Sequence, residues 1–521
     1  MFSRIFSAGT SGIDGQIISV EVDSHDGLPS IVMVGYLSSE VREAQERVRT
    51  ALRNSGFRMP PKKTVINLSP ASIRKAGTSY DLAIALAVLA ALGEIDLEAY
   101  QKCLFVGELG LDGTIKPIRG VLPIVLSAKE KGFQKCFLPR ENVREGQAVG
   151  GVRISAPLSL RQCVEWIRHP EKEEQTAVCS TEVFTELSAD EREMKDFSEI
   201  SGQMILRRSA EIAAAGRHNL LMIGEAGAGK TMVAQRIPTI LPPMTEKERM
   251  EVSKIYSVCG LLPKGQTLMG KRPFRSPHHT ISPQALAGGG VNPRPGELSL
   301  ASEGILFLDE FPEFSSKAIE ILRQPLEEKT VTISRLHGTY IFPANVLLVA
   351  AMNPCPCGFY PDRNRCRCTN GQIQHYLGKI SKPILERFDI AAEATPVSYQ
   401  ELRNSEINES SRQIRSRVEA AAERQKYRFQ NTAICYNSEM GGKEIETYCA
   451  ISEKEEKFLE TVYRKKHLSA RAVHKILKVA RTIADLGERE QISHGDLCEA
   501  IGYRSLETKS WGKEGWYGLN L

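Results

Sequence analysis

The sequence predicts an α/β fold built from two α/β domains and a C-terminal helical lid. Short strands and amphipathic helices alternate through residues 1–169. Continuously apolar strands lie between helices in residues 196–395, a pattern typical of a buried parallel sheet. Residues 396–521 have mostly helical periodicity. Residues 170–195 are charged and lack apolar periodicity, so we expect a linker between the two α/β domains.

The composition is that of a globular protein. Of 521 residues, 41% are apolar and 25% are charged, which excludes a collagen-like, coiled-coil or disordered chain. The 68 basic and 63 acidic residues leave a net charge of +5, too small for this length to indicate nucleic-acid binding by itself. The longest apolar run, Leu82–Leu92, is shorter than the roughly 20 residues of a membrane-spanning helix. The N-terminus lacks the layout of a signal peptide, so we expect a cytoplasmic protein with reduced cysteines and no membrane partner.

Helices and strands of the first domain are predicted from apolar spacing and from their ends. Val41, Val48 and Leu52 share one helical face, for example, and Gly56 follows as a stop signal. On these grounds we expect helices at Ser39–Asn54, Asp81–Leu92 and Leu122–Lys131, and strands at Ile17–Val22, Ile31–Val34, Thr64–Leu68, Leu104–Glu108 and Lys135–Leu138.

The second domain contains a phosphate-binding signature. After a predicted helix at Met204–Ala215 and a strand at Asn219–Ile223, the chain reads Gly224-Glu225-Ala226-Gly227-Ala228-Gly229-Lys230-Thr231, which fits G-x-x-x-x-G-K-[ST]. The glycines let backbone N–H groups surround phosphate oxygens, and the following helix adds its positive N-terminus. We expect Lys230 to reach the β- and γ-phosphates of ATP and Thr231 to bind Mg²⁺. Glu225 should point to solvent, because a carboxylate near a triphosphate is unfavourable.

Two further apolar strands of this domain end in polar residues. The strand at Gly304–Leu308 leads into Asp309 and Glu310, and the strand at Ala344–Ala351 leads to Asn353. Parallel strands bring their C-terminal ends to one edge of a sheet. Asp309 is therefore the candidate Mg²⁺ ligand, and Glu310 the residue that polarises the attacking water. Asn353 either reaches the γ-phosphate or this water, or only forms a turn before a proline.

The lid contributes helices and one of two candidate arginines. Helices are expected at Glu401–Arg424, Glu453–Lys466, Ala470–Leu486 and His494–Ile501. Arg387 follows a short helix, and Arg471 opens the helix at 470. Either arginine could stabilise the charge that develops during phosphoryl transfer, although a lone arginine is more often a surface ion-pair partner.

Taken together, these motifs resemble the AAA+ ATPases of the magnesium-chelatase-like branch, and more narrowly the ComM/YifB group. The narrower resemblance covers nearly the whole chain and is clearest at Asp196–Gly202, Phe274–His279, Arg294–Ser299 and Ala351–Pro354. It implies a homo-oligomeric ring, a hexamer, that binds ATP and Mg²⁺ between subunits. Arg387 would be the finger that reaches the neighbour's ATP, and Arg471 the second sensor in the lid. One departure is Glu225-Ala226, where the family often has Pro-Pro.

The resemblance also implies an action on DNA: helicase or branch migration in recombination of incoming DNA, as in natural transformation. It places pore-facing insertions near Gly288–Gly296 and Glu328–Arg335. Basic clusters at Arg53–Lys63 and Tyr463–Arg481 could bind single-stranded or branched DNA without reading its sequence, or could be solvated helix faces. Two alternatives stay open. The first is a chelatase-type ATPase that remodels a protein partner, and the second a scaffold in which ATP only assembles the ring.

The first domain resembles the proteolytic domain of Lon. Lys75–Ser79 matches the segment that carries Lon's serine nucleophile, but Pro123 stands where the resemblance expects the lysine base. Lys129 and Lys131 are the nearest substitutes, late on a predicted helix. We therefore expect a protease fold without protease chemistry, and an ATP-dependent serine protease is the disfavoured alternative.

Four cysteines cluster in an otherwise glycine- and proline-containing loop. Cys355, Cys357, Cys366 and Cys368 form C-x-C-x₈-C-x-C and could hold Zn²⁺ as four thiolates, or could be free thiols. The adjacent histidines His278 and His279 lack the spacing of metal ligands, and we expect a structural or interface role for them.

Overall fold

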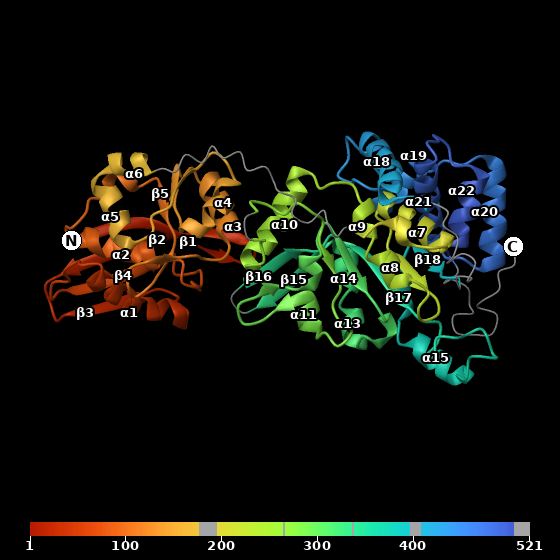
Figure 1. The fold of residues 1–521 in the computed structure, drawn as a ribbon, viewed down its shortest axis with the longest axis horizontal. Helices are drawn as coiled ribbons and strands as arrows, with labels where there is room; N and C mark the ends of the chain where they lie inside the picture. The colour runs from red at the N-terminus through yellow and green to blue at the C-terminus, as the bar shows by residue number, and fades with distance from the viewer. Residues whose placement is uncertain (177–194, 264–265, 336–337, 396–407, 505–521) are drawn as a thin grey trace.

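The computed structural model describes residues 1–176, 195–263, 266–335, 338–395 and 408–504. Figure 1 shows an elongated chain in which an N-terminal domain, a central domain and a C-terminal group of helices follow one another. This arrangement confirms the predicted fold class. Residues 177–194 of the expected linker lie outside the described residues.

The N-terminal domain contains one seven-stranded sheet in the order β3-β4-β2-β1-β5-β8-β9. Helix α2 lies wholly inside this domain, with every residue from Asp81 to Ala91 buried, as its apolar run predicts. The strands are β1 (Phe2–Ser11), β2 (Asp14–His25), β3 (Ser30–Val34), β4 (Lys63–Ser69), β5 (Cys103–Phe105), β8 (Lys135–Phe137) and β9 (Arg153–Ser155), with a separate pair β6 (Glu108–Leu109) and β7 (Ile115–Lys116). The helices are α1 (Ser39–Asn54), α2 (Asp81–Ala91), α3 (Val121–Glu130), α4 (Val143–Gln147), α5 (Leu160–Arg168) and α6 (Pro170–Thr176).

This domain contains elements that the sequence prediction did not include, among them β1, β9, α4, α5 and α6. Strand β1 was not expected, because small side chains such as Ser7 and Ala8 occupy its buried positions; the Ser7 hydroxyl donates to the Phe105 carbonyl at 2.8 Å. Residues 170–176, expected in the linker, form helix α6 instead. There Glu173 accepts hydrogen bonds from Lys135 and Ser155, which fastens α6 to the first domain.

The central domain is built on a five-stranded parallel sheet in the order β11-β14-β17-β10-β18. Its strands are β10 (Leu220–Ile223), β11 (Phe274–Arg275), β14 (Ile305–Leu308), β17 (Leu347–Met352) and β18 (Ile390–Glu393). The helices are α7 (Met204–Gly216), α8 (Lys230–Ala234), α9 (Ile237–Ile240), α10 (Glu246–Cys259), α11 (Pro283–Ala287), α12 (Glu297–Leu300), α13 (Ser316–Glu320), α14 (Arg323–Glu328), α15 (Asn370–Gly378) and α16 (Lys382–Leu385). Because β10, β14 and β17 are adjacent and parallel, the residues that follow them meet at one edge.

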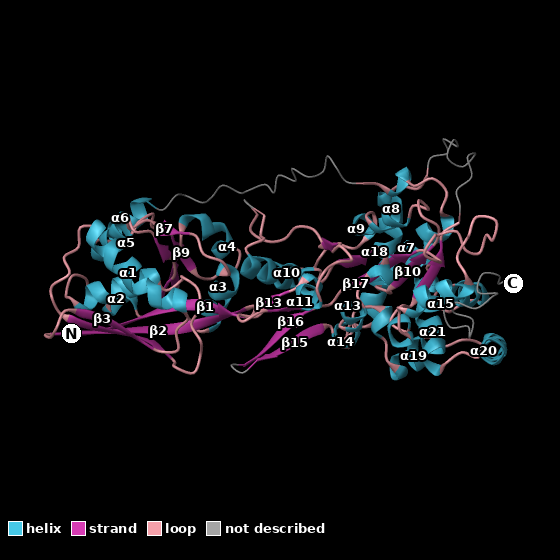
Figure 2. Cartoon of the chain, turned by 90° about the horizontal axis from the view of Figure 1, so that it is seen from below, coloured by secondary structure: helices cyan, strands magenta, loops and turns pink. Residues whose placement is uncertain are grey.

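Two antiparallel hairpins project from the central domain at the expected insertions. One pairs β12 (Gly288–Gly289) with β13 (Arg294–Pro295), and the other pairs β15 (Thr330–Arg335) with β16 (Gly338–Pro343). The predicted second insertion thus covers only the first strand of its hairpin. Arg335 Nε donates to the Gly290 carbonyl at 3.4 Å and joins the two hairpins. Figure 2 shows β1 and β2 reaching toward this region, where Ile13 packs in the same core as Phe342.

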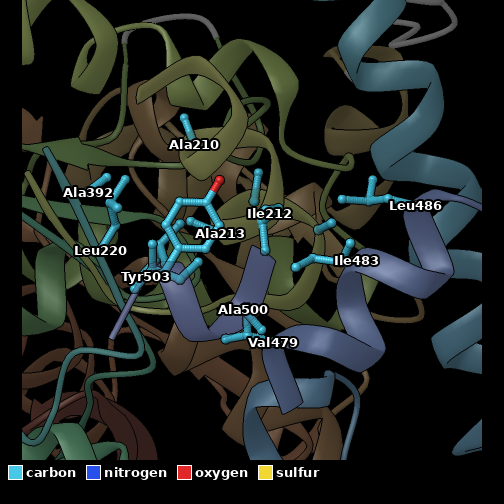
Figure 3. Close-up of a cluster of buried hydrophobic side chains, with 14 of the residues drawn as sticks. Ala210, Ile212, Ala213, Leu220, Ala392, Val479, Ile483, Leu486, Ala500 and Tyr503 are labelled. Carbon is cyan, nitrogen blue, oxygen red and sulfur yellow. The ribbon is translucent and has the colours of Figure 1, made fainter. Parts of the chain in front are cut away.

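The lid contains α18 (Ser411–Arg428), α19 (Gly442–Tyr448), α20 (Glu453–Lys466), α21 (Ala470–Leu486) and α22 (His494–Gly502). The helix predicted from Glu401 begins later: residues 401–407 lie outside the described residues, and Ser410 caps α18 by accepting from the Gln413 amide. Figure 3 shows the buried core in which side chains of α21 and α22 meet those of α7, β10 and β18. No helix among the described residues is long and apolar enough to cross a bilayer.

Candidate nucleotide site and cysteine cluster

The phosphate loop, residues Gly224–Thr231, joins β10 to α8 in a conformation that requires its glycines. Gly227 and Gly229 have φ of +81° and +78°, values that side chains other than glycine's rarely tolerate. A Cβ on Gly224 would lie 2.5 Å from the Cβ of Ala394. The spacing of glycines in the sequence is therefore set by backbone geometry and by packing.

Lys230 occupies the centre of the site. Its Nζ donates to the carbonyls of Gly224 and Glu225, both at 2.8 Å, and to Asn353 Oδ1 at 3.1 Å. Burial lowers the pKa of Lys230 to about 8, although the negative charges of Asp309 and Glu225 oppose this shift. The amine thus sits in a cage of neutral oxygens that lacks a directly bonded anion, and a phosphate would supply one.

Thr231 and Asp309 form the second pair of the site. The Thr231 hydroxyl donates to Asp309 Oδ2 at 2.7 Å, although the two residues are far apart in the sequence. Hydroxyl and carboxylate oxygens are the ligands that Mg²⁺ takes beside a nucleotide. The residues present therefore fit the magnesium ion expected here.

Asn353 follows β17, and its side chain accepts from Lys230 instead of only closing a turn. Glu310 follows Asp309 and has φ of +51°, a left-handed conformation that is strained for a glutamate. Its Oε2 lies 3.1 Å from Nδ1 of His279. His279 therefore contacts Glu310, the glutamate expected to polarise the attacking water.

Sequence reasoning missed the contact between His279 and Glu310 because its signal is tertiary. The histidine follows β11, the strand that pairs with β14 in the parallel sheet. The ring of its neighbour His278 packs against it at a tilt of 34°, with ring centroids 4.1 Å apart. Only the order of the strands brings the loop after β11 beside the end of β14.

Arg387 and Arg471 each form an ion pair with a glutamate of the central domain. Arg387 is 12% exposed and forms an ion pair with Glu327 of α14. Arg471 is 75% exposed, and its Nη1 lies 3.6 Å from Oε2 of Glu386, the residue before Arg387. Within the part of the chain that the structure describes, neither arginine hydrogen-bonds to the phosphate loop.

The basic cluster predicted at Tyr463–Arg481 is not one surface. Lys475 pairs with Asp389 at 2.9 Å, Lys478 donates to the Ser438 carbonyl at 3.0 Å, and Arg481 pairs with Asp485. Helix α21 turns these cations inward, so that Lys475 fastens the lid to the central domain while Lys478 and Arg481 stabilise the interior of the lid. On the N-terminal domain, by contrast, Arg53–Lys63 contributes exposed cations, and Arg49, Arg53 and Arg58 line one groove.

The predicted protease nucleophile lacks a base. Ser79 is buried and its hydroxyl donates to the Ala8 carbonyl at 2.8 Å. Pro123 is buried in α3, and Lys129 donates to the Val149 carbonyl instead. Lys75 is fully buried but donates to the Pro70 carbonyl. Among the described residues, no lysine amine hydrogen-bonds to the Ser79 hydroxyl.

The four predicted cysteines converge in the cysteine loop, residues 354–369. All four Sγ atoms lie within 4.8 Å of one another, with Cys355 3.4 Å from Cys357 and 3.8 Å from Cys366. Four thiolates around Zn²⁺, at a Zn–S distance of about 2.3 Å, are separated by roughly 3.8 Å. The cluster could therefore hold Zn²⁺ without a change of backbone.

Electrostatics favour thiolate formation at one of these positions. Burial raises the pKa of the Cys357 thiol, but the amide of Phe359 and the neighbouring thiols stabilise its anion more strongly, and its pKa is lowered to about 6. A thiolate is the form that binds a metal ion.

We expected Glu225 to point to solvent, but it forms an ion pair instead. It is 25% exposed, and its Oε2 lies 3.0 Å from Nη1 of Arg365 in the cysteine loop. Glu225, which stands where the family often has proline, thus has an ion-pair partner, Arg365, that only the tertiary structure provides.

The lowered pKa of Lys230 makes nucleotide affinity depend on pH. Without nucleotide, Lys230 loses its proton as the pH rises through about 8, whereas a bound triphosphate favours the charged amine. The dissociation constant of the nucleotide should therefore be lowest below pH 8. Above pH 8 it should rise by up to about tenfold per pH unit. Titration calorimetry at pH 8.5 in buffers of different ionisation enthalpy should detect proton uptake. A constant affinity from pH 7 to 9.5 would contradict the assignment.

Replacing His279 should remove its contact with Glu310 and leave that carboxylate available to polarise water. We expect His279→Ala to raise basal ATP turnover by about two- to fivefold, the range of a partly exposed polar contact, with unchanged nucleotide affinity. Steady-state turnover and a binding titration measure the two quantities separately. His278→Ala removes the neighbouring ring and leaves the contact between His279 and Glu310, so it serves as the control. A lower turnover in His279→Ala would mean that the histidine orients Glu310 productively.

Comparison with known proteins agrees with this geometry. Three family models match the chain: subunit ChlI of Mg-chelatase over residues 20–142, magnesium chelatase subunit ChlI over 196–402, and the ChlI C-terminal model over 408–504. Residues 408–504 are the described lid, so the family match extends over every part of the site.

Full-length relatives are also found. The competence protein ComM of Haemophilus influenzae is 39% identical over 96% of this chain and 97% of its own. The uncharacterized protein YifB of Escherichia coli is 37% identical over 97% of each chain. A shorter similarity, 29% identity over 25% of this chain, relates it to Lon protease 2 of Bacillus subtilis. The chain therefore belongs to the ComM/YifB family of magnesium-chelatase ChlI-like AAA+ ATPases.

Proposed function

We propose that this protein is a ring-shaped ATPase motor that acts on DNA, with helicase or branch-migration activity in the recombination of incoming DNA. One observation carries the motor part of this proposal: Lys230, Thr231, Asp309, Glu310 and Asn353 meet at one sheet edge. These residues are the elements that phosphoryl transfer to water needs within one subunit. The name of the competence protein ComM supports the DNA part.

The need for an arginine at this edge supports the ring. Catalysis of phosphoryl transfer is strengthened by an arginine that stabilises transition-state charge, often supplied by another molecule. Arg387 pairs with Glu327 and Arg471 with Glu386, and among the described residues neither arginine hydrogen-bonds to its own phosphate loop. A neighbouring subunit that presents this face would complete the site, and a closed hexamer would provide one such contact for every chain.

Each residue at the site has a separate task in this proposal. Lys230 exchanges the two carbonyls of its own loop for β- and γ-phosphate oxygens. Thr231 and Asp309 hold Mg²⁺, which neutralises charge on those oxygens when it is bound. Glu310 accepts the proton of the attacking water after its separation from His279, and Asn353 orients that water or the γ-phosphate.

In this proposal the hairpins couple DNA binding to the catalytic glutamate, Glu310. Val291 at the tip of the first hairpin is 82% exposed and Ile341 of the second is 58% exposed. Short helix α11 alone separates the first hairpin from the loop that carries His279. DNA that moves this hairpin would shift His279 and release Glu310, so that hydrolysis follows engagement.

A protein-remodelling ATPase is the second candidate, because the three family models that match are those of a chelatase subunit. Its ATPase core is the same, and only the stimulating partner differs. A scaffold that uses ATP only for assembly would not need Glu310. An ATP-dependent protease is disfavoured, since no lysine amine among the described residues hydrogen-bonds to the Ser79 hydroxyl.

The first test is ATP turnover with no DNA, single-stranded DNA and a branched junction. We expect DNA to raise the rate, and we expect Glu310→Gln to lower it by about 100-fold or more while nucleotide still binds. Glu313→Gln makes the same substitution at a half-exposed residue three positions away and should keep the wild-type rate. Strand displacement then tests for helicase activity.

The outcomes separate the candidates. Turnover that a protein partner stimulates, and DNA does not, would support the chelatase-type motor. DNA-dependent function that survives Glu310→Gln would support the scaffold. Cleavage of casein that Ser79→Ala abolishes would support the protease.

We also propose that the cysteine cluster binds one structural Zn²⁺ per chain, because four protein thiolates leave no open coordination position. Elemental analysis of the purified protein should find about one zinc per chain, and Cys366→Ser should lose most of it. Cys435→Ser replaces an exposed cysteine outside the cluster and should retain the metal. Wild-type protein without zinc, even after incubation with zinc chloride, would exclude this site.

A further inference from the structure

The cysteine loop lies directly against the phosphate loop. Arg365 Nη1 is 3.2 Å and 3.0 Å from the two carboxylate oxygens of Glu225. A Cβ on Gly358 would lie 3.6 Å from the backbone nitrogen of Ala226, so the two loops are also close at the backbone. The cysteine loop begins just after Asn353, which accepts from Lys230. It therefore contacts the nucleotide site from two directions.

The orientation of Arg365 depends on the fold of the cysteine loop. Its guanidinium lies over the ring of Phe359, 4.2 Å from the centroid. Its amide donates to the Asp362 carbonyl at 3.2 Å. The next residue is Cys366, a member of the cluster. Whatever holds the four sulfur atoms together therefore also sets where Arg365 points.

Electrostatics give this contact a consequence for nucleotide binding. Glu225 belongs to the loop that surrounds the phosphates, and its negative charge repels a triphosphate. The guanidinium of Arg365 cancels that charge at short range. Without Arg365, the same carboxylate would oppose every nucleotide that enters the loop.

We propose that the cysteine loop is a metal-dependent brace of the phosphate loop. Zn²⁺ at the four cysteines holds Arg365 on Glu225 and thereby sets the affinity for nucleoside triphosphate. Loss of the metal would release the arginine and weaken nucleotide binding while every catalytic residue stays in place. This inference rests on the proposed zinc site, and it requires neither DNA nor a ring.

The test measures the dissociation constant of a fluorescent, non-hydrolysable ATP analogue with Mg²⁺ by anisotropy. Arg365→Ala should weaken binding by about three- to tenfold, which corresponds to the loss of one charge neutralisation. Glu225→Ala should bind as well as wild type or better. The double variant should match Glu225→Ala, because the arginine acts only through the glutamate. Arg367→Ala removes an exposed arginine of the same loop and should change nothing.

The metal arm uses Cys366→Ser and chelator-treated wild-type protein, each with its zinc content measured. Both should bind the analogue as weakly as Arg365→Ala, and neither change should weaken an Arg365→Ala background further. Readdition of zinc chloride should restore the chelated protein. In a Glu225→Ala background, removal of the metal should have no effect on affinity.

Three outcomes would overturn the inference. Wild-type affinity in Arg365→Ala would show that Arg365 does not influence nucleotide binding. A double variant as weak as Arg365→Ala would mean that the arginine contacts the nucleotide directly. Metal-free protein with wild-type affinity, or wild-type protein that contains no zinc, would remove the metal dependence. Because no DNA is present, these results are independent of whether the motor acts on DNA.

Discussion

The hydrogen bond between Lys230 and Asn353 is the contact on which the nucleotide site depends. It joins the phosphate loop after β10 to the end of β17, and it exists only because the two strands are adjacent and parallel. β14, the neighbour of β17 on its other side, places Asp309 against Thr231 in the same way. The order of the strands therefore brings the residues of the nucleotide site together, and the loops that follow the strands carry the reactive side chains.

Two segments outside this frame each contact one acid of the site. His279 reaches Glu310 from the loop after β11, and Arg365 reaches Glu225 from the cysteine loop. Both pairs are partly exposed, so each can break at modest cost in stability. Partly exposed pairs at a buried core are suited to regulation, because a partner or a metal ion can change them without disturbing the sheet.

In the described part of the N-terminal domain, the serine and the lysine of the Lon-like segment both donate to backbone carbonyls. Ser79 is buried and donates to a backbone carbonyl, and Lys75 is fully buried on another carbonyl. Burial gives both groups structural hydrogen bonds. Exposed arginines in and just after α1 line a groove of this domain.

The sequence by itself determined the phosphate loop, the acids after β14, the lid helices α20, α21 and α22, and the four-cysteine set. These features are encoded in short segments, where glycine spacing, apolar periodicity and residue type act through local backbone geometry. Helices Glu453–Lys466 and Ala470–Leu486 begin and end where their periodicity predicts. Only the tertiary structure decided which charged groups meet. It paired Arg365 with Glu225 and His279 with Glu310, and it turned Lys475 and Arg481 inward. Strand β1 likewise owes its place to partners rather than to its own small residues. Contacts between distant segments depend on sheet order and helix packing, and no local pattern in the chain carries that information.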